Sequence, residues 1–408
     1  MVSHVRPHSS ARVEPVPADE LVVRFRAGRY RHAADLDFAP AQLEACAESL
    51  DERGHYDLLR LAAWGHSLRQ EHAEALALQI KVFALRPDAE ALRNIGVFAR
   101  KAGDRWHAVD FLLRHHSRVP EDSGLYDILA HNCGHFGDLE AARRFGCRSL
   151  ELKDAAHRVP QEPWNLPSVP PFNPGRGPST NVISFSLFGT SPRYVRPLLL
   201  SAEARPHLYP LWTIRVYVDD TVSPDTIRAL QAKNCQVIRV TNTGGIPGTF
   251  WRFFVADDPS VDRYIVRDAD SIINVRERIA VDAWIASGLH FHVMRDFYTH
   301  SELILAGMWG GVRGALPPMQ SMIRAWQRNR RDRVVYNDVT ADQAFLRERI
   351  WPYLRRSALI HDSVFDHTDG ADFPTLGTLP PWMHVGQDNS IFLQPRRPAP
   401  LETLSAMF

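Results

Sequence analysis

The chain has 408 residues, of which 45% are hydrophobic and 23% charged, proportions typical of a globular protein, and this length predicts two domains. A formal net charge of +1 gives no overall attraction to nucleic acid, and no apolar run is long enough to span a membrane. The four cysteines have neither zinc-site nor disulfide spacing, so we expect free thiols and a cytoplasmic protein.

The first half of the chain is predicted to be helical. Residues 1–30 show no signal-peptide pattern, and we expect a disordered or extended leader there. Over 31–158 helical patterns recur: Gly103-Asp104 and Gly137-Asp138 stand 34 residues apart. Self-similarity at this period resembles the tetratricopeptide repeat, in which stacked helical pairs share a core. The alternative is an irregular helical bundle, and either arrangement offers a surface for a protein partner.

A proline-rich stretch separates this half from the rest. Residues 159–180 contain seven prolines, which block helix continuation and predict a linker packed along the surface. From 181 to 395 strand and helix patterns alternate, and 396–408 form a tail. Such alternation predicts a mainly parallel sheet covered on both faces. The expected strands cover residues 182–188, 212–218, 236–240, 264–266 and 291–294.

Two carboxylates directly follow the central predicted strand. The apolar run Tyr264 to Val266 leads into Asp268 and Asp270, and alternate residues of extended chain point to the same side. Two carboxylates about 4 Å apart repel by roughly 1 kcal/mol in water and about 4 kcal/mol at an effective dielectric constant near 20. The pair therefore requires a shared proton or a divalent cation, unless both side chains face solvent.

Several polar residues are predicted to meet at one edge of the sheet. Ligands bind beyond the carboxyl ends of the strands in parallel α/β sheets. The residues that follow predicted strands are Gly189, Asp219, Asp220, Asp268 and Asp270. Their convergence favours a ligand site over solvent-exposed strand ends.

The second half resembles the nucleotide-sugar-binding part of GT-A glycosyltransferases over roughly Asn181 to Asp388. The Asp-x-Asp pair follows a βαβαβ pattern, as in that family. Residues 305–311 (LAGMWGG) resemble its small-residue loop. Residues 340–345 (TADQAF) resemble the Asp-Gln helix start of retaining members similar to glycosyltransferase family 8. Residues 384–387 (HVGQ) resemble its C-terminal segment that closes on metal and diphosphate.

The resemblance implies a Rossmann-like GT-A domain that transfers a sugar from a nucleotide-sugar donor, with UDP-sugar expected. The acceptor would be a glycan, a lipid-linked saccharide or a protein, and the absence of an evident base pair favours retention. Mn²⁺ or Mg²⁺ would stabilise charge on the leaving diphosphate. Its implied ligands are Asp268, Asp270 and His384, with His361 and His367 as alternatives to the histidine.

The remaining roles also follow from the resemblance. Arg252 precedes the Asp-x-Asp pair by 16 residues, where similar enzymes place an arginine on the diphosphate. The other implied donor contacts are Phe188, Gly189, Thr190, Tyr194, Asp220, Arg267, Gly310 and Arg313. Acceptor contacts are expected at Arg295, His300 and Trp309, and catalytic roles at Asp296, Asp342 and Gln343.

Three other interpretations fit part of the pattern. A haloacid-dehalogenase-type phosphatase also begins with Asp-x-Asp, but it requires a downstream lysine, and none follows Lys233. A nucleotidyltransferase would share metal and sheet, yet Gly189 to Arg193 is a poor version of its glycine- and lysine-rich loop. A catalytically inactive helical-repeat scaffold is the third, and it predicts no turnover of nucleotide sugars.

Overall fold

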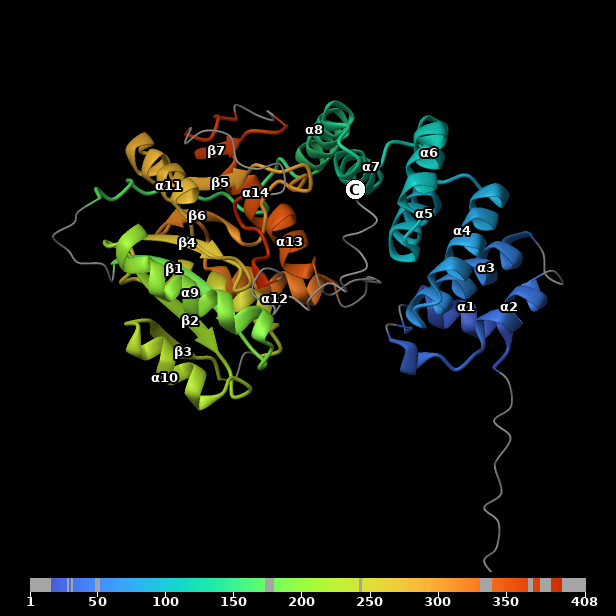
Figure 1. The fold of residues 1–408 in the computed structure, drawn as a ribbon, viewed down its shortest axis with the longest axis horizontal. Coiled ribbons are helices and arrows are strands. Elements are labelled where there is room, and N and C mark those ends of the chain that lie inside the picture. The colour runs from blue at the N-terminus through green and yellow to red at the C-terminus, as the bar shows by residue number, and fades with distance from the viewer. Residues whose placement is uncertain are drawn as a thin grey trace, which may run out of the picture. The chain divides into compact units, whose positions relative to one another are not determined.

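The computed structural model describes residues 16–27, 29–30, 32–47, 52–172, 180–241, 244–330, 340–365, 370–374 and 383–390. The chain forms two compact units that divide between Asn132 and Cys133, well before the predicted boundary at residue 158 (Figure 1). The predicted tail over 396–408 lies outside the described residues.

The first unit is helical, as predicted. Helix α1 (Ala18–Arg26) buries Leu21, Val22 and Phe25, which corrects the expectation of a disordered or extended leader at these positions. The helices that follow in this unit are η1 (Ala33–Asp35), α2 (Pro40–Ala47), α3 (Glu52–Leu68), α4 (His72–Leu85), α5 (Ala89–Ala102), α6 (Arg105–His115) and η2 (His116–Arg118), and α7 (Ser123–His135) begins there.

The helices repeat with the predicted period because the turn residues recur. Gly103 and Gly137 adopt positive φ angles of 81° and 83° after α5 and α7. Gln70, one period earlier, adopts a φ of 65° although it is not glycine. This left-handed conformation ends a helix most readily at glycine. Asp138 then accepts a hydrogen bond from the Ala141 N–H at 3.0 Å and caps the next helix.

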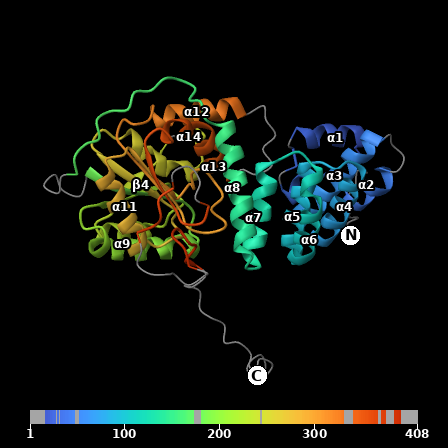
Figure 2. The same ribbon diagram turned by 90° about the horizontal axis from the view of Figure 1, so that it is seen from above.

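Helix α8 (Leu139–Ala156) belongs to the second unit, together with the sheet (Figure 2). Its Leu150 lies in the hydrophobic core of that unit. Asp154 accepts a hydrogen bond from the Trp351 indole N–H at 2.8 Å. The last predicted repeat helix is therefore part of the α/β unit.

The linker lies against the same unit over its described part, 159–172. The Trp164 indole N–H donates to the Gly314 carbonyl at 2.9 Å. The Pro167 carbonyl lies 2.7 Å from His290 Nε2. Tyr353 donates its hydroxyl proton to the Glu162 carbonyl at 3.2 Å. These contacts fix a chain that has no regular secondary structure of its own.

Among the described residues, seven strands form one mixed sheet in the order β3-β2-β1-β4-β6-β5-β7 (Figure 1). All neighbouring strands pair in parallel except those involving β6, which is antiparallel to β4 and β5. The strands are β1 (Asn181–Leu187), β2 (Thr213–Val218), β3 (Gln236–Arg239), β4 (Arg263–Arg267), β5 (Phe291–Arg295), β6 (Met308–Val312) and β7 (Ala358–Asp362). The connecting helices are α9 (Pro192–Leu208), α10 (Pro224–Ala232), η5 (Gly248–Asp257), α11 (Val275–Ser287), α12 (Met319–Arg330), α13 (Ala341–Phe345), η7 (Leu346–Ile350) and α14 (Trp351–Leu354).

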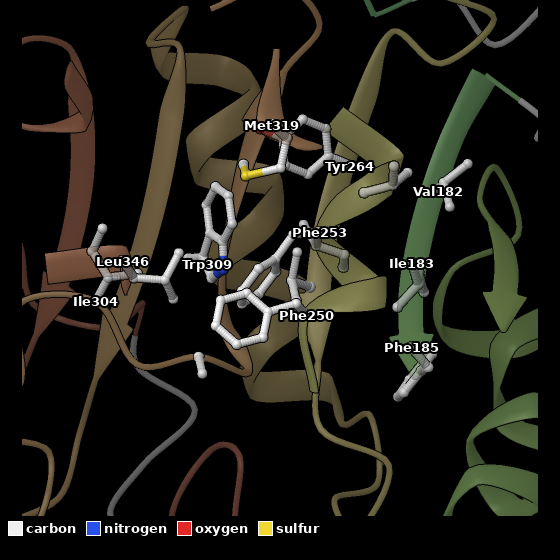
Figure 3. Packing of buried hydrophobic residues seen from close by; sticks show 14 of the residues in the cluster. Val182, Ile183, Phe185, Phe250, Phe253, Tyr264, Ile304, Trp309, Met319 and Leu346 are labelled. Carbon is white, nitrogen blue, oxygen red and sulfur yellow. The ribbon is translucent and has the colours of Figure 1, made fainter. Parts of the chain in front are cut away.

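The two central strands of the sheet, β1 and β4, lie in the hydrophobic core. All seven residues of β1 and all five of β4 are buried, as expected where both faces of a sheet are covered. Figure 3 shows Trp309 of β6 beside Phe253 of η5 and Tyr264 of β4. The ring centroid of Trp309 lies 5.8 Å from that of Phe253 and 5.6 Å from that of Tyr264. No helix among the described residues is both long and apolar enough to cross a membrane.

Candidate active site

A cavity of about 360 Å³ opens at the carboxyl ends of β1 and β4. These neighbouring strands lie where the strand order reverses, because the chain goes from β1 to β2 and β3 and then returns to β4 on the other side. Ligands bind at such switch points in open α/β sheets. The lining residues are Ser186, Leu187, Phe188, Tyr194, Thr249, Arg252, Asp268, Ala269, Asp270, His300, Leu305, Ala306, Met308, Asp342, Gln343, Gly386 and Asp388.

Arg252 is a buried cation at the centre of the site. Its guanidinium forms an ion pair with Asp268 through Nη1, and Nη2 donates to Asp342 at 2.8 Å. Burial disfavours the charged guanidinium, but the two carboxylates outweigh burial and raise the pKa of Arg252. The Ser186 hydroxyl accepts the Arg252 N–H at 2.8 Å, so β1 fixes the backbone from which this side chain extends.

Asp270 lies in a second charge cluster. Arg193, at the start of α9, places Nη2 3.1 Å from Asp270 and 3.0 Å from Asp388. Burial, together with the charges of Asp268 and Asp388, raises the pKa of Asp270 to about 6, although Arg193 lowers it. The ionised form of Asp270 is therefore less stable here than it would be in water.

The charges of the cavity suit a divalent cation. Four carboxylates line it, and the two guanidinium groups that pair with them leave two negative charges in excess when all are ionised. Carboxylate oxygens are the ligands that hard divalent cations prefer. Their oxygens are of the kind that hold Mn²⁺ or Mg²⁺, but among the described residues the group of three ligands that lies close enough for a metal ion is Asp296, His300 and His384. The carboxylates are Asp268, Asp270, Asp342 and Asp388, and the cations are Arg193 and Arg252.

The predicted small-residue segment has two different roles. Gly307 lies against Asp268, and a Cβ at this position would overlap the carboxylate. Gly310 and Gly311 instead belong to β6, where a Cβ on either would meet Tyr264. The expectation of a donor contact at Gly310 is corrected, because this glycine allows close strand packing.

Two aromatic residues that follow β1 in the chain line the cavity. Phe188 and Tyr194 line the cavity and are 41% and 36% exposed, so both rings are accessible to a base. Gly189, also predicted there, has a φ of 73° and donates its N–H to Thr221 at 2.5 Å outside the cavity lining. Thr190 is exposed to solvent and does not line the cavity. Asp220 pairs with Arg239 at 2.6 Å and does not line the cavity.

The connection between β5 and β6 forms another part of the cavity wall, where His300 lines it. Asp296 lies behind it and accepts hydrogen bonds from the Val385 N–H at 3.1 Å and from Arg276 at 3.2 Å. Burial raises the pKa of Asp296 to about 6, against the lowering effect of the Val385 N–H. Asp296 is held by these partners and does not itself line the cavity, so its catalytic role stays a prediction.

The structure separates His384 from the Asp-x-Asp pair. Ligand atoms of His384, Asp296 and His300 lie within 4.8 Å of one another, and within the part of the chain that the structure describes no group of three joins His384 to Asp268 and Asp270. His361 is buried in β7 with Nδ1 2.8 Å from His292 Nε2, so it does not reach the cavity. His367 lies outside the described residues.

Four further predicted contacts are corrected by the sheet. Arg267 is 1% exposed and pairs with Glu277 at 3.2 Å on the far face of β4. Arg295 is fully buried and bonded to Asp362 at 2.8 Å. Trp309 is fully buried in the core. Arg313 follows antiparallel β6 and therefore lies at the amino end of β4, where its N–H donates to Asp262 at 3.0 Å.

The predicted Asp-Gln pair reaches the cavity from the start of α13. Asp342 is 5% exposed, and burial raises its pKa while Arg252 opposes the shift. The Gln343 side-chain oxygen is buried without a hydrogen-bond partner among the described residues. An unpartnered oxygen at a cavity wall is ready to accept a hydrogen bond from a ligand.

Sequence reasoning missed two charged residues of the site. Arg193 follows Pro192 at the start of α9, and its position after a strand end was the available signal. Asp388 comes four residues after His384 in a segment that was already singled out. The Asn389 side chain accepts the Ile272 N–H at 2.8 Å, and the Asn389 N–H donates to the Asp270 carbonyl at 2.9 Å, so this segment is fixed to the Asp-x-Asp loop.

No protein-family model and no curated protein matches the chain. An O-GlcNAc transferase variant from Thermobaculum terrenum is similar at 15% identity and a TM-score of 0.37, over 61% of this chain and 45% of that one. The crystal structure of a mycobacterial protein is similar at 12% identity and a TM-score of 0.25, over 45% of this chain and 64% of that one. The chain therefore spans less than two thirds of the length of either structure.

Proposed function

We propose that this chain is a GT-A type glycosyltransferase whose cavity binds a nucleotide-sugar, with a UDP-sugar as donor and Mn²⁺ or Mg²⁺ as cofactor. The observation that carries the proposal is the meeting of Asp268, Asp270 and the buried Arg252 at the switch point of the sheet. A cavity of about 360 Å³ is within the range of small-molecule sites.

Different residues of the cavity suit the base, the diphosphate and the cation of such a donor. The exposed ring of Phe188 is suited to stacking on a base. Arg193 and Arg252 supply positive charge for a diphosphate. Asp268 and Asp270 would hold the cation, which when bound neutralises the charge that develops on the leaving diphosphate.

The partners of Asp342 and Asp296 favour retention. An inverting enzyme requires a general base that faces the acceptor. Asp342 is held in an ion pair by Arg252 at 2.8 Å, and Asp296 is engaged behind the wall. The proposal therefore assigns Asp342 and Gln343 to positioning the donor sugar. The acceptor would be a saccharide, free or lipid-linked, or a protein, and the helical unit would offer a surface to it or to a protein partner.

The test is hydrolysis of a panel of nucleotide sugars with and without Mn²⁺, using water as acceptor. We expect Mn²⁺-dependent release of UDP that Asp268→Ala abolishes while the thermal unfolding transition is retained. Asp225→Asn is the matched control, because Asp225 is a carboxylate 86% exposed on α10. Absence of hydrolysis and of UDP binding in the parent protein would favour an inactive scaffold and overturn the proposal.

A further inference from the structure

Lys153 of α8 is a buried lysine. Its side chain is 4% exposed, Nζ donates to the Ser301 carbonyl at 2.6 Å, and Nζ lies 3.5 Å from the Glu302 carboxylate. Lysine is rarely buried unless it is paired, because the ammonium group loses its hydration. The hydrogen bond from Lys153 to the Ser301 carbonyl compensates for part of this loss, and it joins residues that are 148 positions apart in the sequence.

The residues that Lys153 contacts belong to the connection between β5 and β6. This connection contributes His300, Leu305 and Ala306 to the lining of the cavity. Ser301 and Glu302 follow His300 directly, so a displacement of their backbone would move the wall. No contact between Lys153 and the cavity itself is required for this effect.

Two other cations hold the same short segment. Arg347 of η7 donates to the Glu302 carboxylate at 2.7 Å. Arg295 of β5 donates to the Leu303 carbonyl at 3.0 Å. Three cations from three different elements therefore hold the consecutive residues Ser301, Glu302 and Leu303. Lys153 is the cation that α8 contributes.

Helix α8 is itself packed too closely to move independently of the sheet. Gly146 of α8 lies against Phe365, and any Cβ there would overlap the ring. Asp154, next to Lys153, accepts hydrogen bonds from Trp351 at 2.8 Å and from Arg355 at 3.1 Å. The ammonium group of Lys153 is consequently held at a fixed position relative to the wall.

We propose that Lys153 is a positioning residue that sets the cavity wall presented by His300, Leu305 and Ala306. The inference rests on the proposed function, in which this wall faces the transferred sugar and the acceptor. It makes α8, a helix of the repeat pattern, a structural part of the active site.

The first test is hydrogen–deuterium exchange in Lys153→Met, which keeps most of the side-chain length and removes the charge. We expect peptides that cover residues 297–306 to exchange about tenfold faster than in the parent protein, because local opening becomes easier. Lys233→Met is the matched control, because Lys233 is partly exposed on the same unit, 3.4 Å from Glu203, and should leave this segment unchanged. Unchanged exchange in Lys153→Met would overturn the proposal.

The second test separates positioning from donor binding. With UDP and Mn²⁺, we expect the Kd of Lys153→Met to stay within about twofold of the parent value, while kcat for UDP-sugar hydrolysis falls about tenfold through misplacement of the wall. An equal loss in Kd and kcat would contradict a positioning role. If the parent protein hydrolyses no nucleotide sugar, the proposed function fails, but the exchange experiment still decides whether Lys153 holds the wall. Should Lys153→Met not fold, Glu302→Gln provides a second comparison, in which the contacts of both Lys153 and Arg347 with this segment are weakened.

Discussion

Asp270 should destabilise the protein when no ligand is bound. Its pKa rises from 3.8 to about 6 on folding, mainly through burial, with Asp268 and Asp388 adding to the shift. A shift of about 2 pKa units corresponds to about 3 kcal/mol at a pH where the carboxyl is ionised in both states. Asp270→Asn, which mimics the neutral form, is therefore expected to raise the free energy of unfolding by about 2–3 kcal/mol at pH 7.5.

The sign of the pH dependence follows from the raised pKa. Below about pH 3 the carboxyl is largely protonated in both states, so Asp270→Asn should have little effect. Between pH 4 and 6 the folded protein keeps a proton that the unfolded chain loses, and the stability of the parent protein falls as the pH rises. The advantage of the variant should therefore grow over this range and level off above about pH 6.5.

Urea denaturation of both proteins from pH 4 to 8 with EDTA measures this difference. Asp225→Asn serves as the control, since Asp225 is 86% exposed and should show little change. Added Mn²⁺ should stabilise the parent protein and leave Asp270→Asn nearly unaffected, because the variant lacks a cation ligand. A variant less stable than the parent at pH 7.5 without metal would refute the reasoning.

Three more predictions follow from the burial and pairing of single residues. Arg252→Met should lower the free energy of unfolding, measured by urea denaturation, by about 3–5 kcal/mol, because Asp342 is left buried without its ion pair. Adding Asp342→Asn to the same chain should restore part of this lost stability. Phe188→Ala should weaken UDP binding about tenfold in titration calorimetry without changing thermal stability, because the ring is 41% exposed and available for stacking. Trp309→Ala should lower the free energy of unfolding by about 3–5 kcal/mol, because Trp309 is fully buried in the core. A variant that keeps its stability and loses affinity for the acceptor would contradict this assignment.

The central features of the sheet follow from local sequence. Tyr264 to Val266 is a short apolar run, and Val182 to Leu187 carries two small serines among apolar residues, so both segments suit strands that are buried on both faces. Parallel strands bring their carboxyl ends to one edge, so the proximity of Asp268, Asp270 and the end of β1 could be inferred from the chain alone. Arg252 lines the same cavity and pairs with Asp268, while its contact with a diphosphate stays a prediction.

Other features depend on contacts that no local pattern encodes. The segment around Trp309 contains three glycines, which suggested a loop, but Gly310 and Gly311 are required by close packing of β6 on Tyr264. The reversed direction of β6 then carries Arg313 to the opposite edge of the sheet. Arg267 and Arg295 are arginines next to site residues in sequence, yet alternation along the strand turns them towards the buried partners Glu277 and Asp362.

The position of α8 shows why a sequence repeat need not mark a structural boundary. The period of about 34 residues depends on turn residues such as Gly103 and Gly137, which fix where helices begin and end but not what they pack against. What decides the packing of α8 is a set of residues within the helix: Gly146 and Leu150 are closely packed against the sheet unit, and Lys153 and Asp154 have buried polar partners there. Removal of residues 1–158 would delete these contacts and leave the Ser301 carbonyl and the Trp351 indole without the partners described here. A truncation that tests the role of the helical repeats must therefore retain α8, because otherwise it disturbs the cavity wall at the same time.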